Sequence, residues 1–322
     1  MRLAQLAGVL LAAACAAPIV ALAQAYPAKP VRLLVPYPPG GGTDIVARVV
    51  AQKFLENTGQ TMIVENKPGG SEMIATEALA RAAADGYTMG LVSNAFSINA
   101  SLATKLPFDP VRDFIPVTPL VTVPFIFVVH PGVPAKTLPE LVALARAKPG
   151  VLNYASLGPG TIHHFAMEWF KRLAGIDIVA VPYKGLAAAL AAGMAGEVQV
   201  VVTGMTAGLA PVNSGKLRAL AVAGAKRTEV APELATVAEL GFPGYDAGSW
   251  YGVLLPAGTP ADIVARLNAE LTRILISADV KERFRAVGVD TTPMSPAAFA
   301  EFVRTDIQLW ARIVKLVDAR QQ

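Results

Sequence analysis

Two glycine-rich segments of this chain combine hydroxyl groups with backbone that can approach a bound molecule closely. The first runs from Pro36 to Asp44 and reads Pro-Tyr-Pro-Pro-Gly-Gly-Gly-Thr-Asp. Glycines let backbone N–H groups point at a ligand, and a helix that starts there adds the positive end of its dipole. The segment therefore suits a carboxylate or a phosphate, with Tyr37 as a wall. Asp44 either accepts from a ligand hydroxyl or caps the helix, and a plain structural turn is the alternative.

The second segment, Ala155 to His164, has the same design. Ser156 and Thr161 supply hydroxyls, and the amides of Gly160 and Thr161 are expected at a helix start. The sequence therefore predicts a second anion cradle.

The adjacent His163 and His164 invite a metal-site reading. Neighbouring residues do not share a helix face, and the chain has 3 His in total, so we expect no metal. His164 is expected to hydrogen-bond to the backbone and orient the loop. No Gly-Lys-Ser/Thr follows the first segment and no G-x-S-x-G surrounds Ser156, so neither a P-loop nor a hydrolase elbow is predicted. We expect no enzyme activity and no cofactor.

Weaker candidates follow predicted strands or turns elsewhere. Lys67 to Ser71 reads as a turn whose Ser71 caps the next helix, and plain turn chemistry is the alternative for each weaker candidate. Met205 is a candidate whose alternative is a core position. The candidate ligand-binding residues are Tyr37, Pro39, Gly40, Gly41, Gly42, Thr43, Asp44, Ser93, Asn94, Ser156, Gly158, Gly160, Thr161, His164, Tyr183, Thr203 and Met205.

Short apolar runs alternate with amphipathic runs along the chain, which indicates an α/β architecture with mostly parallel sheets flanked by helices. A Thr-x-x-Glu capping box at Thr137 opens one of the helices. Strands are predicted at 31–35, 87–92, 126–129, 176–181 and 198–202, and helices at 43–55, after 137–140, at 162–173, after 259–262 and after 295–296.

The length of 322 residues suits two domains, and no low-complexity linker separates them. We therefore expect crossing strands at 124–130 and 250–255. The predicted division is 26–125 plus 248–322 for domain 1 and 126–247 for domain 2.

The N-terminus reads as an export signal. Arg2 precedes an uncharged Ala/Leu-rich stretch that ends in Ala23-Gln24-Ala25, a small-residue cleavage site. Cleavage after Ala25 is predicted, and an uncleaved anchor is the alternative. Cys15 follows three alanines, which is a poor lipidation signal, and its removal would leave a mature chain without cysteine.

The composition excludes two broad classes. Apolar residues make up 53% of the chain, which argues against disorder. The net charge of +4 comes from basic residues scattered among acidic ones, so no nucleic-acid partner is predicted.

Seven motifs occur in an order that resembles the Bug family, the TctC-like substrate-binding proteins of tripartite tricarboxylate transporters. They cover nearly the whole mature chain. The motifs are Pro36 to Arg48, Glu65-Asn66-Lys67-Pro68-Gly69, Asp85-Gly86-Tyr87-Thr88, Tyr154 to His164, Val181-Pro182-Tyr183-Lys184-Gly185, Gly215 to Val222, and Pro256-Ala257-Gly258-Thr259-Pro260.

The resemblance implies a periplasmic binding protein with a type II Venus flytrap fold, and we expect it to act as a monomer without a cofactor. In that family the loops matching 38–44 and 156–164 hold one carboxylate through amides, hydroxyls and waters. A large and a small membrane subunit would accept the solute. A ligand-presenting sensor role, or a periplasmic hydrolase, is the alternative.

This sequence departs from the family pattern at two places. Gly69-Gly70 continues as Ser71-Glu72-Met73 instead of a run of small residues, and Ala192 stands where an Asp is frequent. The missing Asp argues against amino-acid ligands and favours a dicarboxylate or an aromatic carboxylate such as a terephthalate-like acid. Side chains around Glu72, Ala192, Met205 and Trp250 are expected to set selectivity.

Overall fold

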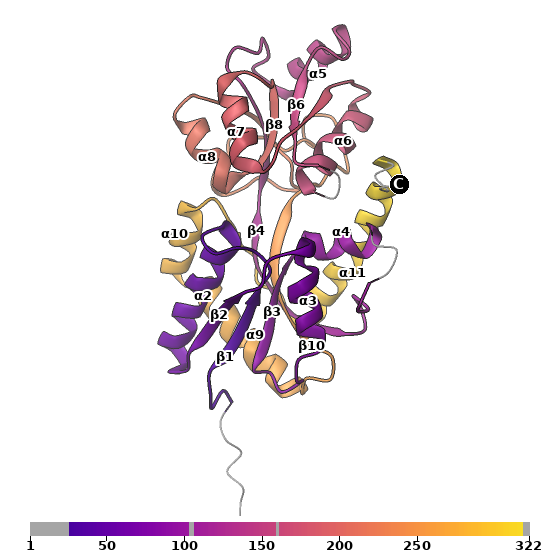
Figure 1. Cartoon of the computed structure of the whole chain (residues 1–322). Helices are drawn as coiled ribbons and strands as arrows, with labels where there is room; N and C mark the ends of the chain where they lie inside the picture. Colours follow the sequence, from indigo (N-terminus) through magenta and orange to yellow (C-terminus); the bar gives the residue numbers. More distant parts are fainter. Residues whose placement is uncertain (1–25, 103–105, 159–160, 318–322) are drawn as a thin grey trace, which may run out of the picture.

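The computed structural model describes residues 26–102, 106–158 and 161–317. They form two lobes, each built around one β-sheet with helices against it, and two crossing segments join the lobes (Figure 1). This confirms the predicted two-lobed α/β architecture. The predicted cleavage site and the end of the signal segment lie outside the described residues.

The first lobe contains a six-stranded sheet in the order β11-β4-β10-β3-β1-β2. Its strands are β1 (Val31–Val35), β2 (Met62–Asn66), β3 (Thr88–Ser93), β4 (Phe114–Val123), β10 (Ser249–Pro256) and β11 (Asp290–Thr291). Its helices are α2 (Gly42–Thr58), the short 3-10 turn η2 (Gly70–Glu72), α3 (Met73–Ala80), α4 (Asn94–Leu102), α9 (Ala261–Ile276), α10 (Ala278–Ala286) and α11 (Pro296–Val317).

The second lobe contains a five-stranded sheet in the order β7-β6-β8-β5-β9. Its strands are β5 (Phe125–Val129), β6 (Asn153–Ser156), β7 (Val179–Pro182), β8 (Val200–Gly204) and β9 (Arg218–Val222). Its helices are α5 (Leu138–Ala147), α6 (Ile162–Ala174), α7 (Leu186–Ala195) and α8 (Met205–Asn213).

The strand directions place both glycine-rich loops on the interlobe side of the molecule. We call the two crossing segments, where β4 leads into β5 and where the chain returns into β10, the hinge. β4 runs toward the second lobe because it leads through Pro124 into β5. β1 and β3 run in the same direction as β4, since β10 is antiparallel to both β3 and β4. β6, β7 and β8 are parallel to one another and antiparallel to β5, so they run back toward the hinge. The carboxyl ends of both sets of parallel strands therefore meet at the interlobe side.

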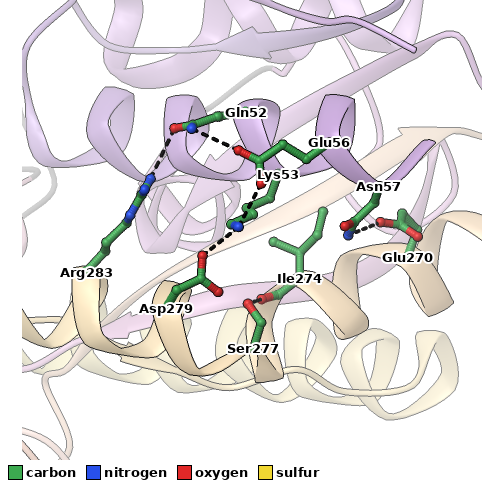
Figure 2. Close-up of polar contacts among 9 residues, drawn as sticks. All are labelled: Gln52, Lys53, Glu56, Asn57, Glu270, Ile274, Ser277, Asp279 and Arg283. Atoms are coloured by element: carbon green, nitrogen blue, oxygen red, sulfur yellow. Dashed lines mark hydrogen bonds and ion pairs between the residues drawn. The ribbon is translucent and has the colours of Figure 1, made fainter. Parts of the chain in front are cut away.

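Helix α2 carries the first glycine-rich loop at its N-terminus and is fixed to the lobe along its length. Its buried face includes Val46, Val50 and Phe54, which fit helical spacing. Its polar face is tied to α9 and α10, where Lys53 Nζ lies 2.6 Å from Asp279 Oδ2. Figure 2 shows this contact beside those of Asn57 with Glu270 and of Arg283 with Gln52. The loop thus leads into a helix whose apolar and polar faces both contact the rest of the lobe.

The two lobes also touch through α11 and α6, beside the hinge. The rings of Phe165 on α6 and Trp310 on α11 have centroids 5.9 Å apart. Tyr245, in the segment that leads to β10, donates from its hydroxyl to the carbonyl of Ala166 at 2.8 Å. The hinge region is therefore packed rather than a free tether.

Most predicted elements match the structure. The predicted strand at 31–35 is β1, the predicted helix at 162–173 is α6, and the Thr137 side chain accepts from Glu140 N as a cap. The prediction that Ser71 caps a helix was wrong: α3 begins at Met73, and Ser71 has φ 48° with no capping bond. Within the described ranges, no helix has the length and apolar character that spanning a bilayer requires. The domain bounds 26–125 plus 248–322 and 126–247 stay a prediction.

Candidate ligand site between the lobes

The first loop ends at a helix start that no side chain caps. Gly41 is the N-cap of α2, and among the described residues no side-chain acceptor takes a first-turn N–H there. Gly40 has φ +86°, a conformation that glycine adopts without strain. The backbone donors from Gly41 onward are therefore available to an anion, and Pro39 to Gly41 are exposed.

The Asp44 side chain holds this loop in place through hydrogen bonds. Its Oδ2 accepts from Gly40 N at 2.9 Å and from Arg48 Nε at 2.8 Å, and its Oδ1 accepts from Asn66 Nδ2 at 3.0 Å. Burial alone would raise the pKa of Asp44, but the hydrogen bonds from Arg48, Gly40 and Asn66 outweigh it and lower that pKa. The ionised carboxylate is occupied by loop contacts, which favours the bracing role over contact with a ligand hydroxyl.

A buried polar network lies under the same loop. The Tyr37 hydroxyl is 3.3 Å from Ser93 Oγ, and Ser93 in turn contacts the Glu72 carboxyl through both its hydroxyl and its N–H. Glu72 is 1% exposed. Burial raises the pKa of Glu72 to about 7, against the opposing effect of hydrogen bonds from Ser93 and Tyr37.

Asn94 lies at the start of α4, directly after β3. Its Oδ1 accepts from the Ser249 hydroxyl at 2.6 Å, which links α4 to the crossing strand β10. Its Nδ2 is buried without a hydrogen-bond partner among the described residues. A buried amide left unpaired costs free energy, so Asn94 is a candidate donor to a bound group.

The second lobe approaches the first loop at Gly42. A Cβ placed on Gly42 would lie 3.7 Å from Tyr251 Oη and 4.0 Å from Thr206 Cγ2. Thr206 is in the first turn of α8, so this loop lies against the second lobe. Tyr251 comes from β10, on the opposite strand face to the core residue Trp250.

The second loop, at the start of α6, is organised by side chains. Thr161 is the N-cap and its Oγ1 accepts from His164 N at 3.3 Å while donating to the Gly158 carbonyl at 2.8 Å. Gly158 N donates to Ser156 Oγ at 3.2 Å. Gly160, also predicted for this site, lies outside the described residues.

His164 bonds to side chains and not, as predicted, to the backbone. Its Nδ1 lies 3.1 Å from Ser156 Oγ and 3.2 Å from the Tyr154 hydroxyl. The Tyr154 hydroxyl donates to Glu168 Oε1 at 2.8 Å. Burial lowers the pKa of His164, which favours the neutral imidazole, and its Nδ1 is shared between these two hydroxyls.

Three other candidates in the second lobe have different surroundings. Tyr183 is half-buried, and its N–H donates to the Ser156 carbonyl at 2.9 Å, so it borders the second loop. Thr203 is fully buried and donates to the Gly204 carbonyl. Met205 is 2% exposed and lines an apolar groove made of second-lobe residues alone.

The structure also revises the residues expected to set selectivity. Trp250 is buried in the first-lobe core, where its Nε1 donates to Asp306 Oδ2 at 3.0 Å, and Ala192 is buried in α7. Sequence reasoning missed Tyr251 and Thr206 as loop neighbours. The alternation of β10 could have indicated Tyr251, because it faces away from Trp250, but nothing in the sequence predicts which part of α8 meets Gly42.

The hydrogen-bonding groups that the two loops provide are uncharged and are mainly backbone amides and hydroxyls. Within the described part of the chain, no group of three His, Cys, Asp or Glu residues could hold a metal ion. An uncapped helix start in the first lobe and a group of hydroxyl and imidazole side chains in the second lobe thus lie at the hinge-facing edges of the two sheets.

Comparison with known proteins agrees with this picture. Residues 46–318 match the model of the tripartite tricarboxylate transporter family receptor. Protein BugT of Bordetella pertussis is 35% identical over 322 residues, covering 99% of this chain and 98% of that protein.

Two solved structures from Rhodopseudomonas palustris are also similar. Rpa4515 with adipate has 33% identity and a TM-score of 0.80, covering 91% of this chain and 98% of that one. MatC with bound malate has 31% identity and a TM-score of 0.75, covering 90% and 100%. The fold is that of a Venus flytrap binding protein, and the chain is a receptor rather than an enzyme. It belongs to the Bug/TctC family of solute-binding receptors of tripartite tricarboxylate transporters.

Proposed function

We propose that this protein captures a small dicarboxylate between its lobes and delivers it to a tripartite transporter. The observation that carries the proposal is the pair of helix starts, α2 and α6, at the hinge-facing edges of opposite sheets. A ligand held from both lobes stabilises the closed arrangement, because its affinity then differs between open and closed states.

One carboxylate group of the ligand would lie at the first loop. The uncapped amides from Gly41 to Thr43 would donate to it, and the dipole of α2 would favour its charge. From the other lobe, Ser156 and His164 would complete the set. Of the other predicted ligand-binding residues, Tyr183 at the border of the second loop and Asn94, whose Nδ2 has no partner among the described residues, would form part of the walls.

The proposed ligand class is a short dicarboxylate. Two family members of known structure hold adipate and malate. An aromatic dicarboxylate of the terephthalate type is the second candidate.

The proposal includes the cellular setting. The signal sequence with cleavage after Ala25 would place the mature protein in the periplasm. There it would act as a monomer and hand its ligand to one large and one small membrane subunit. A structure of a relative described as the periplasmic binding protein BugD supports this location.

A thermal-shift panel on the mature chain tests the proposal. We expect adipate, malate or terephthalate to raise the melting temperature by several degrees, since ligand at 100 times its Kd adds about 2.7 kcal/mol. Adipamide, which has the length of adipate without its charges, is the matched control and should give no shift. Silence across these acids and citrate, or an equal shift with adipamide, would contradict carboxylate capture.

A further inference from the structure

Glu72 is buried in a backbone conformation that glutamate rarely adopts. Its φ is 76° and that of Ser71 is 48°, both in the left-handed region, where side chains other than those of Asn and Asp are uncommon. The residue is 1% exposed. Strain and burial of this kind persist only where the surroundings enforce them, and they concentrate at ligand sites.

The Glu72 carboxyl lies under the first loop and is connected to it. Ser93 N donates to Oε2 at 3.1 Å, and Ser93 Oγ contacts Oε1. The same Oγ is 3.3 Å from the hydroxyl of Tyr37, the first side chain of the loop after Pro36. Two hydroxyls thus connect the Glu72 carboxyl group to the first loop.

No described cation faces this carboxyl group. β3, α4 and β10, which surround it, contain no Lys, Arg, His, Asp or Glu, and β10 contributes the phenol of Tyr251. On α3 the one charged side chain is Glu77, which pairs with Arg81. In the first turns of α2, Asp44 is paired with Arg48.

Lys67, the nearest cation along the chain before Glu72, lies 2.7 Å from Glu65. An ionised Glu72 would therefore be an uncompensated buried negative charge beneath a site for a negatively charged ligand. Two like charges in a poorly solvated region repel each other strongly.

We propose that Glu72 selects the charge state of the complex: a carboxylate ligand binds with Glu72 protonated, and capture therefore takes up one proton. This inference rests on the proposed carboxylate function. Burial raises the pKa of Glu72 to about 7, so the proton would be exchanged near neutral pH. By linkage, ligand affinity falls as pH rises through this range.

Calorimetric titration with adipate at pH 6.5 and 8.5 tests the inference. This range lies above the pKa of ordinary free carboxyl groups, about 4, so the probe itself stays ionised. We expect affinity to be about tenfold weaker at pH 8.5. At pH 7.5, titrations in buffers of different ionisation enthalpy should show uptake of roughly half a proton or more per adipate.

Glu72→Gln keeps the size of the side chain and removes its charge, so the affinity should become independent of pH and the proton uptake should vanish. Glu72→Gly suits the positive φ and serves as the second variant if the glutamine variant does not fold. Glu77→Gln removes the one charge of α3, the helix that follows Glu72, and should behave as wild type.

The outcomes separate the two proposals. Adipate binding with equal affinity at both pH values and no proton uptake would overturn the role of Glu72 alone, as would an unchanged pH dependence in Glu72→Gln. If adipate and malate fail to bind wild type and Glu72→Gln at both pH values, carboxylate capture fails and this inference falls with it.

Discussion

The two candidate loops follow the same plan, a strand end and a helix start, but they treat the helix start differently. At α2 the N-cap is Gly41, and no described side chain occupies the first-turn amides. At α6 the N-cap is Thr161, whose side chain accepts from His164 N. The first lobe thus offers bare backbone donors, whereas the second offers hydroxyl and imidazole groups that already hydrogen-bond to one another. This contrast supports our proposal that the first loop binds the charge of the ligand and that the second loop completes the site.

A buried carboxyl group, that of Glu72, is connected to the first loop, and its titration predicts the largest effect on stability. Because burial raises the folded-state pKa of Glu72 from 4.5 to about 7, its contribution to stability is present below pH 4.5 and is lost as pH rises to about 7. Wild type should lose on the order of 2 kcal/mol relative to Glu72→Gln between pH 5 and pH 8. Denaturant unfolding at both pH values measures this, and a difference that does not change with pH would mean that Glu72 is ionised throughout.

Gly42→Pro tests whether the bare amides of the first loop carry the affinity. Proline fits the first position of a helix, and Gly41, with φ −79° and ψ 168°, tolerates a following proline. The substitution removes one N–H and should weaken adipate binding by about thirtyfold, or about 2 kcal/mol, with little loss of stability. Gly42→Ala, which keeps the N–H, is the control, and calorimetry of both decides. Equal affinities would exclude this amide as a donor.

Much of this comparison could be predicted from the sequence, and part of it could not. The glycines of 40–42 and the hydroxyls of Ser156 and Thr161 indicated two helix starts, because local residue preferences fix such starts. The protonation that we propose for Glu72 was out of reach, since its environment depends on Ser93 and Tyr37, which are far from it along the chain. Ser71 was predicted as a cap because serine prefers that position. Its positive φ, which rules out that role, is imposed by the surrounding structure and not by its own preference.

Ser156→Ala probes the second loop and should have a smaller effect than Gly42→Pro. The hydroxyl is one of two partners of His164 Nδ1, and Tyr154 remains when it is lost. We expect about fivefold weaker adipate binding, close to the 1 kcal/mol of one neutral hydrogen bond. A loss larger than that of Gly42→Pro, measured by the same titration, would reverse the proposed ranking of the loops.

Gly41→Ser should make the first loop resemble the second. The φ and ψ of Gly41 suit any residue, and an added Cβ would meet the Pro38 carbonyl oxygen at an ordinary 3.8 Å. A serine cap should stabilise the protein by a few tenths of a kcal/mol and occupy an amide that the ligand needs. Opposite shifts, higher melting temperature and weaker adipate binding, are the expected result. A higher melting temperature together with tighter adipate binding would argue that the ligand does not use these amides.

The central claim is that one carboxylate group is held by both loops at once, and a double-mutant cycle tests it most directly. Adipate affinities are measured for wild type, Gly42→Pro, Ser156→Ala and the double variant. If the loops share one group, the double variant should lose less than the sum of the single losses, with a coupling of at least about 0.5 kcal/mol. Strictly additive losses, or no loss from either substitution, would contradict a shared cradle.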